Sequence, residues 1–137
     1  MSGGETILVV EDADGIRNMV CAMLAQQGYQ CLEASDGADA LRMLDQTSEP
    51  IDLVLTDVIM PKMTGAELSR HLVRLRPELR VVFMSGYSDD PAVREFERIP
   101  PIFLAKPFTS TALFEKVRRA LDEPWCGLPS IASHSAP

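Results

Sequence analysis

The chain has 137 residues, and its 13 lysines and arginines stand against 20 aspartates and glutamates, a net charge of −7. That length is typical of one domain. The acidic surplus excludes a general nucleic-acid binder and argues against docking on an anionic membrane, because both kinds of surface attract lysine and arginine. No apolar run approaches the roughly 20 residues of a membrane span, so we expect no membrane contact.

The cysteines Cys21, Cys31 and Cys126 are odd in number and widely spaced. Their spacing matches neither a disulfide framework nor a zinc site. The first residues also lack the basic and apolar stretches of a secretory signal. These features predict a protein of the reducing cytoplasm.

Five segments have the character of β-strands. Four of them are short, nearly continuous apolar runs at residues 7–10, 51–55, 81–84 and 102–105. Continuous hydrophobicity is typical of parallel strands that are buried on both faces. A weaker candidate at residues 29–33 is expected near an edge of the sheet.

Helical periodicity fills the segments between the strands. One face of the first helix is formed by Ile16, Met19, Val20, Met23 and Leu24. Gly28 then provides a C-terminal stop. The second helix starts near Asp36, and its inward residues are Ala40, Leu41 and Leu44.

The third helix is expected to begin at Thr64, because Glu67 follows at the spacing of a capping box. Its apolar face is Leu68, Leu72 and Leu75. A short fourth helix opens at residues 89–91, where two aspartates precede a proline. The fifth helix begins near Thr109 and buries Leu113, Val117 and Leu121.

Strands and helices therefore alternate about five times. With right-handed crossovers, this order predicts an α/β fold whose five-stranded parallel sheet is doubly wound as (βα)5. We expect the domain to cover residues 5–121. Residues 1–4 look like a linker end or a cloning remnant, and the composition of residues 122–137 predicts a mobile tail.

Polar residues follow the strands at their carboxyl ends, where doubly wound sheets bind ligands. Glu11 and Asp12 come after the first strand, and Asp57 after the third. Ser85 ends the fourth strand, and Lys106 follows the fifth. Three carboxylates, one hydroxyl and one ammonium group are thus expected at one rim of the sheet.

These charges point to phosphoryl chemistry. Clustered carboxylates repel each other, so a hard cation such as Mg²⁺ is the natural neutraliser. Asp57 follows an apolar strand that holds it rigidly, which suits a nucleophile that forms an aspartyl phosphate. Two further carboxylates, Asp14 and Asp36, fit a structural role as helix caps.

Four motifs carry a resemblance to the response-regulator receiver domain of two-component signalling. They are VVED at 9–12, LTDVIMP at 55–61 with MTG at 63–65, MSGY at 84–87, and FLAKPF at 103–108. The resemblance covers roughly residues 5–121 at the expected spacing. It implies a flavodoxin-like strand order of 2-1-3-4-5.

The resemblance also implies a metal site. Glu11, Asp12, Asp57 and the Ile59 carbonyl would be the Mg²⁺ ligands. Glu11 replaces the aspartate that is commoner in the family, which favours a water-bridged contact to the metal. Thr64 stands where an aspartate often precedes the glycine, and it caps a helix equally well.

Catalysis and signalling roles follow from the same resemblance. Asp57 would be the only phosphoacceptor, and Ser85 and Lys106 would hold phosphoryl oxygens. Phe103 would be the switch aromatic, turning inward on phosphorylation and reshaping the face near the fourth and fifth helices. It lacks the hydroxyl of a tyrosine, so we expect a graded shift. The Lys106–Pro107 bond is expected to be cis.

Two bulky residues flank the expected site. Ile59 and Tyr87 stand two residues after Asp57 and Ser85, respectively. They would shield an aspartyl phosphate from water and lengthen its lifetime, or they are simply exposed. The segment between Gly86 and Pro101 looks short for a helix and its loops.

Other functions are weighed against this one. A flavodoxin needs a Ser/Thr/Gly-rich phosphate loop after the first strand, a Rossmann enzyme needs GxGxxG, and a haloacid dehalogenase phosphatase needs a second aspartate at Ile59. The chain has none of these. A receiver fold that works as an interaction module without phosphorylation stays open, although the complete set of site residues speaks against it.

The expected partner is a histidine kinase or a histidine phosphotransfer protein, and a weak homodimer stays open. The chain would catalyse its own phosphorylation and dephosphorylation, with no separate output enzyme domain. The opening residues and the SGYS pattern at 85–88 favour the C-terminal receiver of a hybrid sensor histidine kinase. A stand-alone regulator is the alternative.

Overall fold

The computed structural model describes residues 4–47, 50–60, 62–86 and 102–123. Its five parallel strands form one sheet in the order β2-β1-β3-β4-β5, which confirms the doubly wound fold and the flavodoxin-like order. The expected fourth helix lies outside the described residues, as do residues 1–3 and the tail from 124 onwards. Within the described residues no helix is long and apolar enough to cross a membrane.

The strands are β1 (Thr6–Val10), β2 (Gln30–Ala34), β3 (Leu53–Asp57), β4 (Arg80–Ser85) and β5 (Ile102–Ala105). Strand β1 is buried along its whole length, as is β3, because helices cover both of their faces. Strand β3 begins two residues later than expected. Asp52 lies just before it and closes a loop onto β1, where its carboxylate accepts a hydrogen bond from the Thr6 N–H at 2.8 Å.

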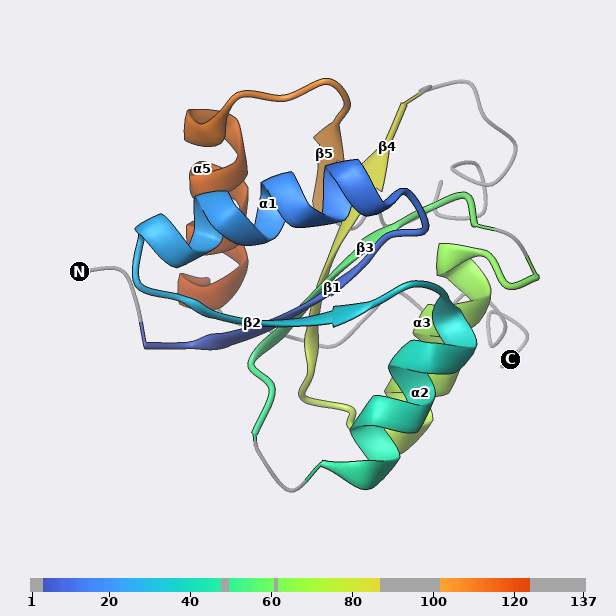
Figure 1. The fold of residues 1–137 in the computed structure, drawn as a ribbon. Coiled ribbons are helices and arrows are strands. Elements are labelled where there is room, and N and C mark those ends of the chain that lie inside the picture. Colours follow the sequence, from blue (N-terminus) through green and yellow to red (C-terminus); the bar gives the residue numbers. More distant parts are fainter. Residues whose placement is uncertain (1–3, 48–49, 61, 87–101, 124–137) are drawn as a thin grey trace, which may run out of the picture.

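The described helices are α1 (Asp14–Gln26), α2 (Gly37–Gln46), α3 (Gly65–Leu75) and α5 (Ser110–Asp122). Figure 1 shows α1 and α5 on one face of the sheet and α2 and α3 on the other. The capping box of Thr64 and Glu67 is confirmed at the start of α3. Asp36 caps α2 as expected by accepting from the Asp39 N–H at 2.7 Å.

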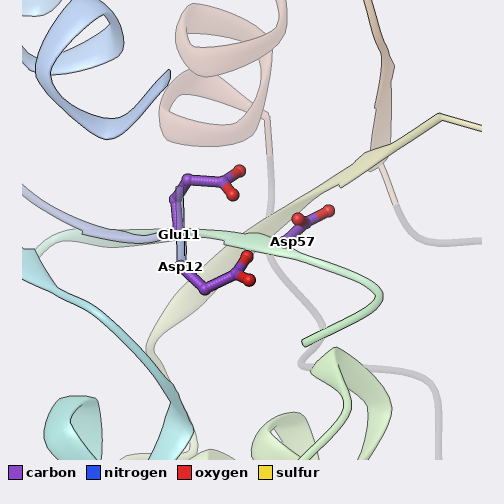
Figure 2. A group of neighbouring side chains, drawn as sticks. All are labelled: Glu11, Asp12 and Asp57. Carbon is purple, nitrogen blue, oxygen red and sulfur yellow. The ribbon is translucent and has the colours of Figure 1, made fainter. Parts of the chain in front are cut away.

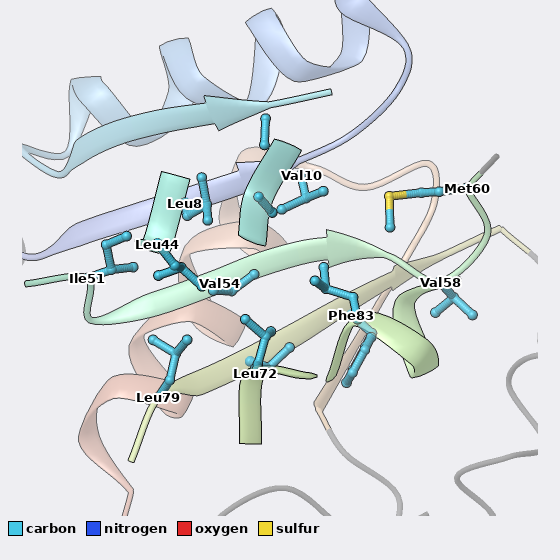
Figure 3. Packing of buried hydrophobic residues seen from close by; sticks show 14 residues of the cluster. Leu8, Val10, Leu44, Ile51, Val54, Val58, Met60, Leu72, Leu79 and Phe83 are labelled. Atoms are coloured by element: carbon cyan, nitrogen blue, oxygen red, sulfur yellow. The ribbon is translucent and has the colours of Figure 1, made fainter. Parts of the chain in front are cut away.

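The sheet divides the core into two apolar layers. In β1, Leu8 and Val10 face the layer under α2 and α3, whereas Ile7 and Val9 face the layer under α1 and α5. This alternation follows from the period of two in a strand. Figure 3 shows the first layer, where Leu72 packs towards β3 and β4. Both layers hold the rim of the sheet in a fixed position.

Three expectations for single residues were wrong. Asp14 is not a cap: Ala13 holds that position without a side-chain bond, and Asp14 pairs with Arg17 one turn on. Met19 is 44% exposed because it lies beside the core-facing stripe of Val20 and Leu24. Leu75 is 55% exposed at the end of α3, where Leu79 closes the apolar layer instead.

Candidate functional site

The ends of β1 and β3 bring three carboxylates together. Oxygens of Glu11, Asp12 and Asp57 lie within 4.8 Å of one another, and Figure 2 shows the three side chains gathered at this rim. Glu11 is 1% exposed and Asp57 is 8% exposed, whereas Asp12 faces solvent. The cluster therefore has a buried base and one side that is open to solvent.

The Lys106 ammonium group bridges the two buried carboxylates, Glu11 and Asp57. Its Nζ donates to Glu11 Oε1 and to Asp57 Oδ2, both at 3.0 Å. The other Glu11 oxygen accepts from the Ala13 N–H at 3.1 Å. The Lys106–Pro107 peptide bond is cis, which confirms that expectation.

Burial and neighbouring charges shift the pKa values of this pair. Burial raises the pKa of Asp57 to about 6, and the negative charge of Glu11 acts in the same direction. The hydrogen bond from Lys106 opposes this rise without cancelling it. Burial would lower the pKa of Lys106, but hydrogen bonds to Glu11 and Asp57 outweigh it and the pKa is raised. Beside the two carboxylates, Lys106 is therefore held in its charged form.

Backbone hydrogen bonds fix the rim on both sides of Asp57. The Val58 N–H donates to the Met84 carbonyl at 2.9 Å, which continues the β3–β4 ladder past Asp57. The Lys106 N–H donates to the Ser85 carbonyl at 2.8 Å, which ties β5 to the end of β4. Ser85 and Lys106 thus come to the rim where the sequence placed them.

Gly65 supports Asp57 from α3. Its N–H donates to the Val58 carbonyl at 2.7 Å. A Cβ atom at this position would lie 2.5 Å from the Asp57 carbonyl oxygen and 3.0 Å from the Val58 Cα. Only glycine lets the start of α3 approach the end of β3 this closely.

Arg17 is a supporting residue that sequence reasoning missed. Its Nη1 donates to the Glu11 carbonyl at 2.8 Å, and its Nε donates to Glu33 at 3.1 Å. Its Nη2 pairs with Asp14 at 2.6 Å. The i, i+3 spacing of Asp14 and Arg17 was a signal for that pair alone. The bond to the Glu11 carbonyl depends on the tertiary fold.

The remaining expected residues surround this centre. Phe103 is half-buried on β5, and its ring centroid lies 5.8 Å from that of Phe83 on β4. Ile59 is 48% exposed. Tyr87 lies outside the described residues.

The donor set fits a hard divalent cation. The candidate metal ligands that the described residues bring together here are all carboxylate oxygens, which suit Mg²⁺ better than metals that prefer nitrogen or sulfur. Lys106 and the Ala13 N–H each take one oxygen of Glu11, so solvent-facing Asp12 is the more available ligand. A water-bridged contact from Glu11 stays a prediction.

A mainly apolar groove lies beside the rim. It is lined by Ile16, Met19, Gly86, Lys106, Pro107 and Phe108. The exposure of Met19 on α1 therefore belongs to a surface that reaches Lys106.

Comparisons with known proteins agree with this architecture. The response regulator receiver domain family matches residues 7–118. The sensor kinase CckA of Brucella abortus (strain 2308) is 35% identical over 124 residues, which cover 90% of this chain. The chain spans 13% of that kinase's length.

Two solved structures have the same fold. The receiver domain from the hybrid histidine kinase CckA is 32% identical with a TM-score of 0.71, covering 85% of this chain and 99% of that one. The response regulator TrrA of Thermotoga maritima, in complex with Mg²⁺ and BeF, is 27% identical with a TM-score of 0.73, covering 86% and 100%. By its sequence, its fold and its acidic rim, the chain belongs to the response regulator receiver domain family of two-component phosphorelays.

Proposed function

We propose that Asp57 accepts a phosphoryl group from a phosphohistidine of a partner protein. A carboxylate oxygen of Asp57 attacks phosphorus, and the bond between phosphorus and the imidazole nitrogen breaks. The products are an aspartyl phosphate and a neutral histidine. The observation that carries this proposal is the placement of Asp57, buried at the rim and bonded to Lys106 at 3.0 Å.

Glu11, Asp12, Asp57 and the Ile59 carbonyl would hold Mg²⁺ at this rim. The cation supplies neutralisation of the negative charge on the phosphoryl oxygens and the carboxylates. The crowding of the three carboxylates supports this proposal, because without a cation they repel an anionic donor.

Lys106 and Ser85 would bind the transferred group. The Lys106 ammonium already lies 3.0 Å from Asp57 Oδ2, so a small movement brings it to a phosphoryl oxygen. Its raised pKa keeps it protonated for that contact. The hydroxyl of Ser85, at the end of β4, would donate to a second oxygen.

The groove beside Lys106 is where we place the histidine-bearing partner. Ile16, Met19 and Phe108 provide an apolar contact surface that adjoins the rim. A helix face of a kinase or phosphotransfer protein that covers these residues would bring its phosphohistidine to Asp57 and exclude water from the reaction.

The phosphorylated domain would present a changed face at β5 and α5 to a partner, with Phe103 as the switch. A cytoplasmic location and the hybrid-kinase context are parts of the same proposal, supported by cysteine spacing and by the similarity to the CckA receiver. The alternative is an interaction module that works without phosphorylation. The complete rim of Glu11, Asp12, Asp57 and Lys106 favours the phosphoacceptor.

Phosphate uptake tests the proposal directly. The chain is incubated with Mg²⁺ and acetyl phosphate, and its intact mass is measured. We expect one added phosphate that disappears in Asp57→Asn and when the metal is chelated. Asp45→Asn, at an exposed position of α2, should take up phosphate like the parent. Equal uptake by Asp57→Asn would show that another residue is the acceptor.

A further inference from the structure

Two cysteines lie against each other between α1 and the edge strand β2. The Cys31 thiol donates a hydrogen bond to the Cys21 carbonyl oxygen, with 3.7 Å between sulfur and oxygen. Both side chains are partly buried at the margin of the apolar layer under α1 and α5, and both thiols are free. A small oxidant can therefore reach them.

A neighbouring ion pair gives independent support for this placement. Arg17 on α1 contacts Glu33 on β2 at 3.1 Å. Cys21 stands one helical turn after Arg17, and Cys31 stands two residues before Glu33, on the same face of the strand. Helix α1 and strand β2 run in opposite directions. One turn onward from Arg17 along α1 and two residues back from Glu33 along β2 therefore bring Cys21 and Cys31 next to each other.

The electrostatic environment distinguishes the two thiols. A hydrogen bond between them raises the pKa of Cys21 and lowers the pKa of Cys31. Burial and the charge of Glu33 raise the pKa of both, and Arg17 has the opposite effect on Cys21. Cys31 is thus the better nucleophile of the pair.

We propose that Cys21 and Cys31 form a redox-active dithiol that a peroxide oxidises to an intramolecular disulfide. The Cys31 thiolate attacks one peroxide oxygen and the O–O bond breaks, which gives a sulfenic acid and a hydroxide that leaves as water with the thiol's proton. The Cys21 sulfur then displaces hydroxide from the sulfenic sulfur, and its own proton completes a second water. The two sulfurs lose two electrons, and the peroxide gains them.

This disulfide would be reversible in a reducing compartment, where such bonds are usually transient and redox-sensing. It would link α1 to β2. The link would lie one helical turn from Arg17, whose side chain donates a hydrogen bond to the Glu11 carbonyl at the rim. The dithiol is separate from the phosphoacceptor chemistry and does not depend on it.

Peptide mass analysis tests the link. The chain is treated with hydrogen peroxide, its remaining thiols are blocked with a maleimide, and it is digested with trypsin. Residues 18–42 form one tryptic peptide that contains both cysteines, whereas Cys126 lies in the peptide of residues 120–137. We expect the first peptide to lose about 2 Da and to carry no maleimide. Cleavage after Tyr29 should leave its halves joined until a dithiol reductant separates them.

Single variants give the controls. Cys126→Ser should keep the link, whereas Cys21→Ser and Cys31→Ser should each abolish it. Two maleimide labels on the oxidised peptide 18–42 would overturn the proposal. So would a link that joins Cys126 or a second chain, or oxidation of Cys21 or Cys31 to a sulfinic or sulfonic acid, which a reductant does not reverse.

Discussion

Asp57 is an acid in a position that disfavours its charge. It is 8% exposed and lies beside Glu11, and the contact with Lys106 does not fully compensate. A carboxylate in this state can be stabilised further by a cation that neutralises its charge. The same features that make the site reactive therefore destabilise the unmodified fold.

This electrostatic cost predicts a pH-dependent effect of Asp57→Asn. The pKa of Asp57 is about 6 in the folded chain, above its value of about 4 in an unfolded one. The folded state then binds the proton more tightly, so the contribution of Asp57 to stability is present below about pH 4 and is lost as the pH rises through 6. Asn is neutral throughout. We expect it to raise the free energy of unfolding by about 1–3 kcal/mol at pH 7.

Urea denaturation between pH 4 and pH 7.5, in the presence of a chelator, measures this difference. The gain from Asp57→Asn should shrink towards pH 4, where Asp57 is protonated in the folded parent as well. Asp45→Asn, exposed on α2, should give no comparable trend. A gain that is the same at both ends of the range would contradict the electrostatic explanation.

Among the described helices, α3 begins against the end of β3, where the Gly65 N–H donates to the Val58 carbonyl at 2.7 Å. We expect Gly65→Ala to displace Asp57, because the new Cβ would lie 2.5 Å from a backbone oxygen that cannot rotate away. Phosphate uptake from acetyl phosphate should fall by about tenfold to a hundredfold, since a displacement of about 1 Å is enough for such a loss.

Gly15→Ala is the matched control. Gly15 lies in the first turn of α1, also near the rim, but a Cβ there meets nothing within 4 Å. It should leave uptake unchanged and slightly favour the helix, because alanine is the better helix former. If Gly65→Ala takes up phosphate as fast as Gly15→Ala, the close approach of α3 does not position Asp57.

The face of α1 that lines the groove predicts a separation between two kinds of phosphodonor. Met19→Glu should slow transfer from a phosphorylated histidine kinase or phosphotransfer protein by about tenfold, because it puts a charge into an apolar contact. Acetyl phosphate is too small to need the groove, so the rate of transfer from it should not change.

Leu75→Glu is the control. Leu75 is similarly exposed but lies on α3, across the sheet, so this change should slow transfer from neither donor. Equal slowing with both donors would mean that Met19 supports the fold or the rim itself.

For the whole molecule, the features that the sequence predicts best are those that follow from the order of the strands. Continuous apolar runs predict the parallel sheet, and a parallel sheet brings Glu11, Asp57 and Lys106 to one rim. Contacts that depend on side-chain direction were missed, as with Arg17, whose bond to the Glu11 carbonyl has no sequence pattern. Helical periodicity also predicted burial of Leu75, which is wrong. Helix α3 ends at this residue, and Leu79 fills the adjacent part of the apolar layer instead.

Transmission of a signal from Asp57 to a partner would involve several strands of the sheet. Phe83 on β4 pairs in register with Phe103 on β5, and their rings are 5.8 Å apart. Ser85 lies on the same face of β4 as Phe83, two residues further on, so a movement of Ser85 towards a phosphate would alter the space beside Phe103. The phosphate can shift Phe103 only by its differential affinity for the two arrangements.

We therefore expect the ring resonances of Phe103 to move when Mg²⁺ and beryllofluoride are added, in a graded way because phenylalanine has no hydroxyl to fix the inward state. The ring of Phe83 should respond with it, since the two are in contact, and Asp57→Asn should abolish both responses. Phe114 on α5 is a reference aromatic in the other apolar layer and should respond less. If Phe103 keeps its resonances while a partner's affinity still changes on addition of beryllofluoride, then the signal leaves the site by another path across the sheet.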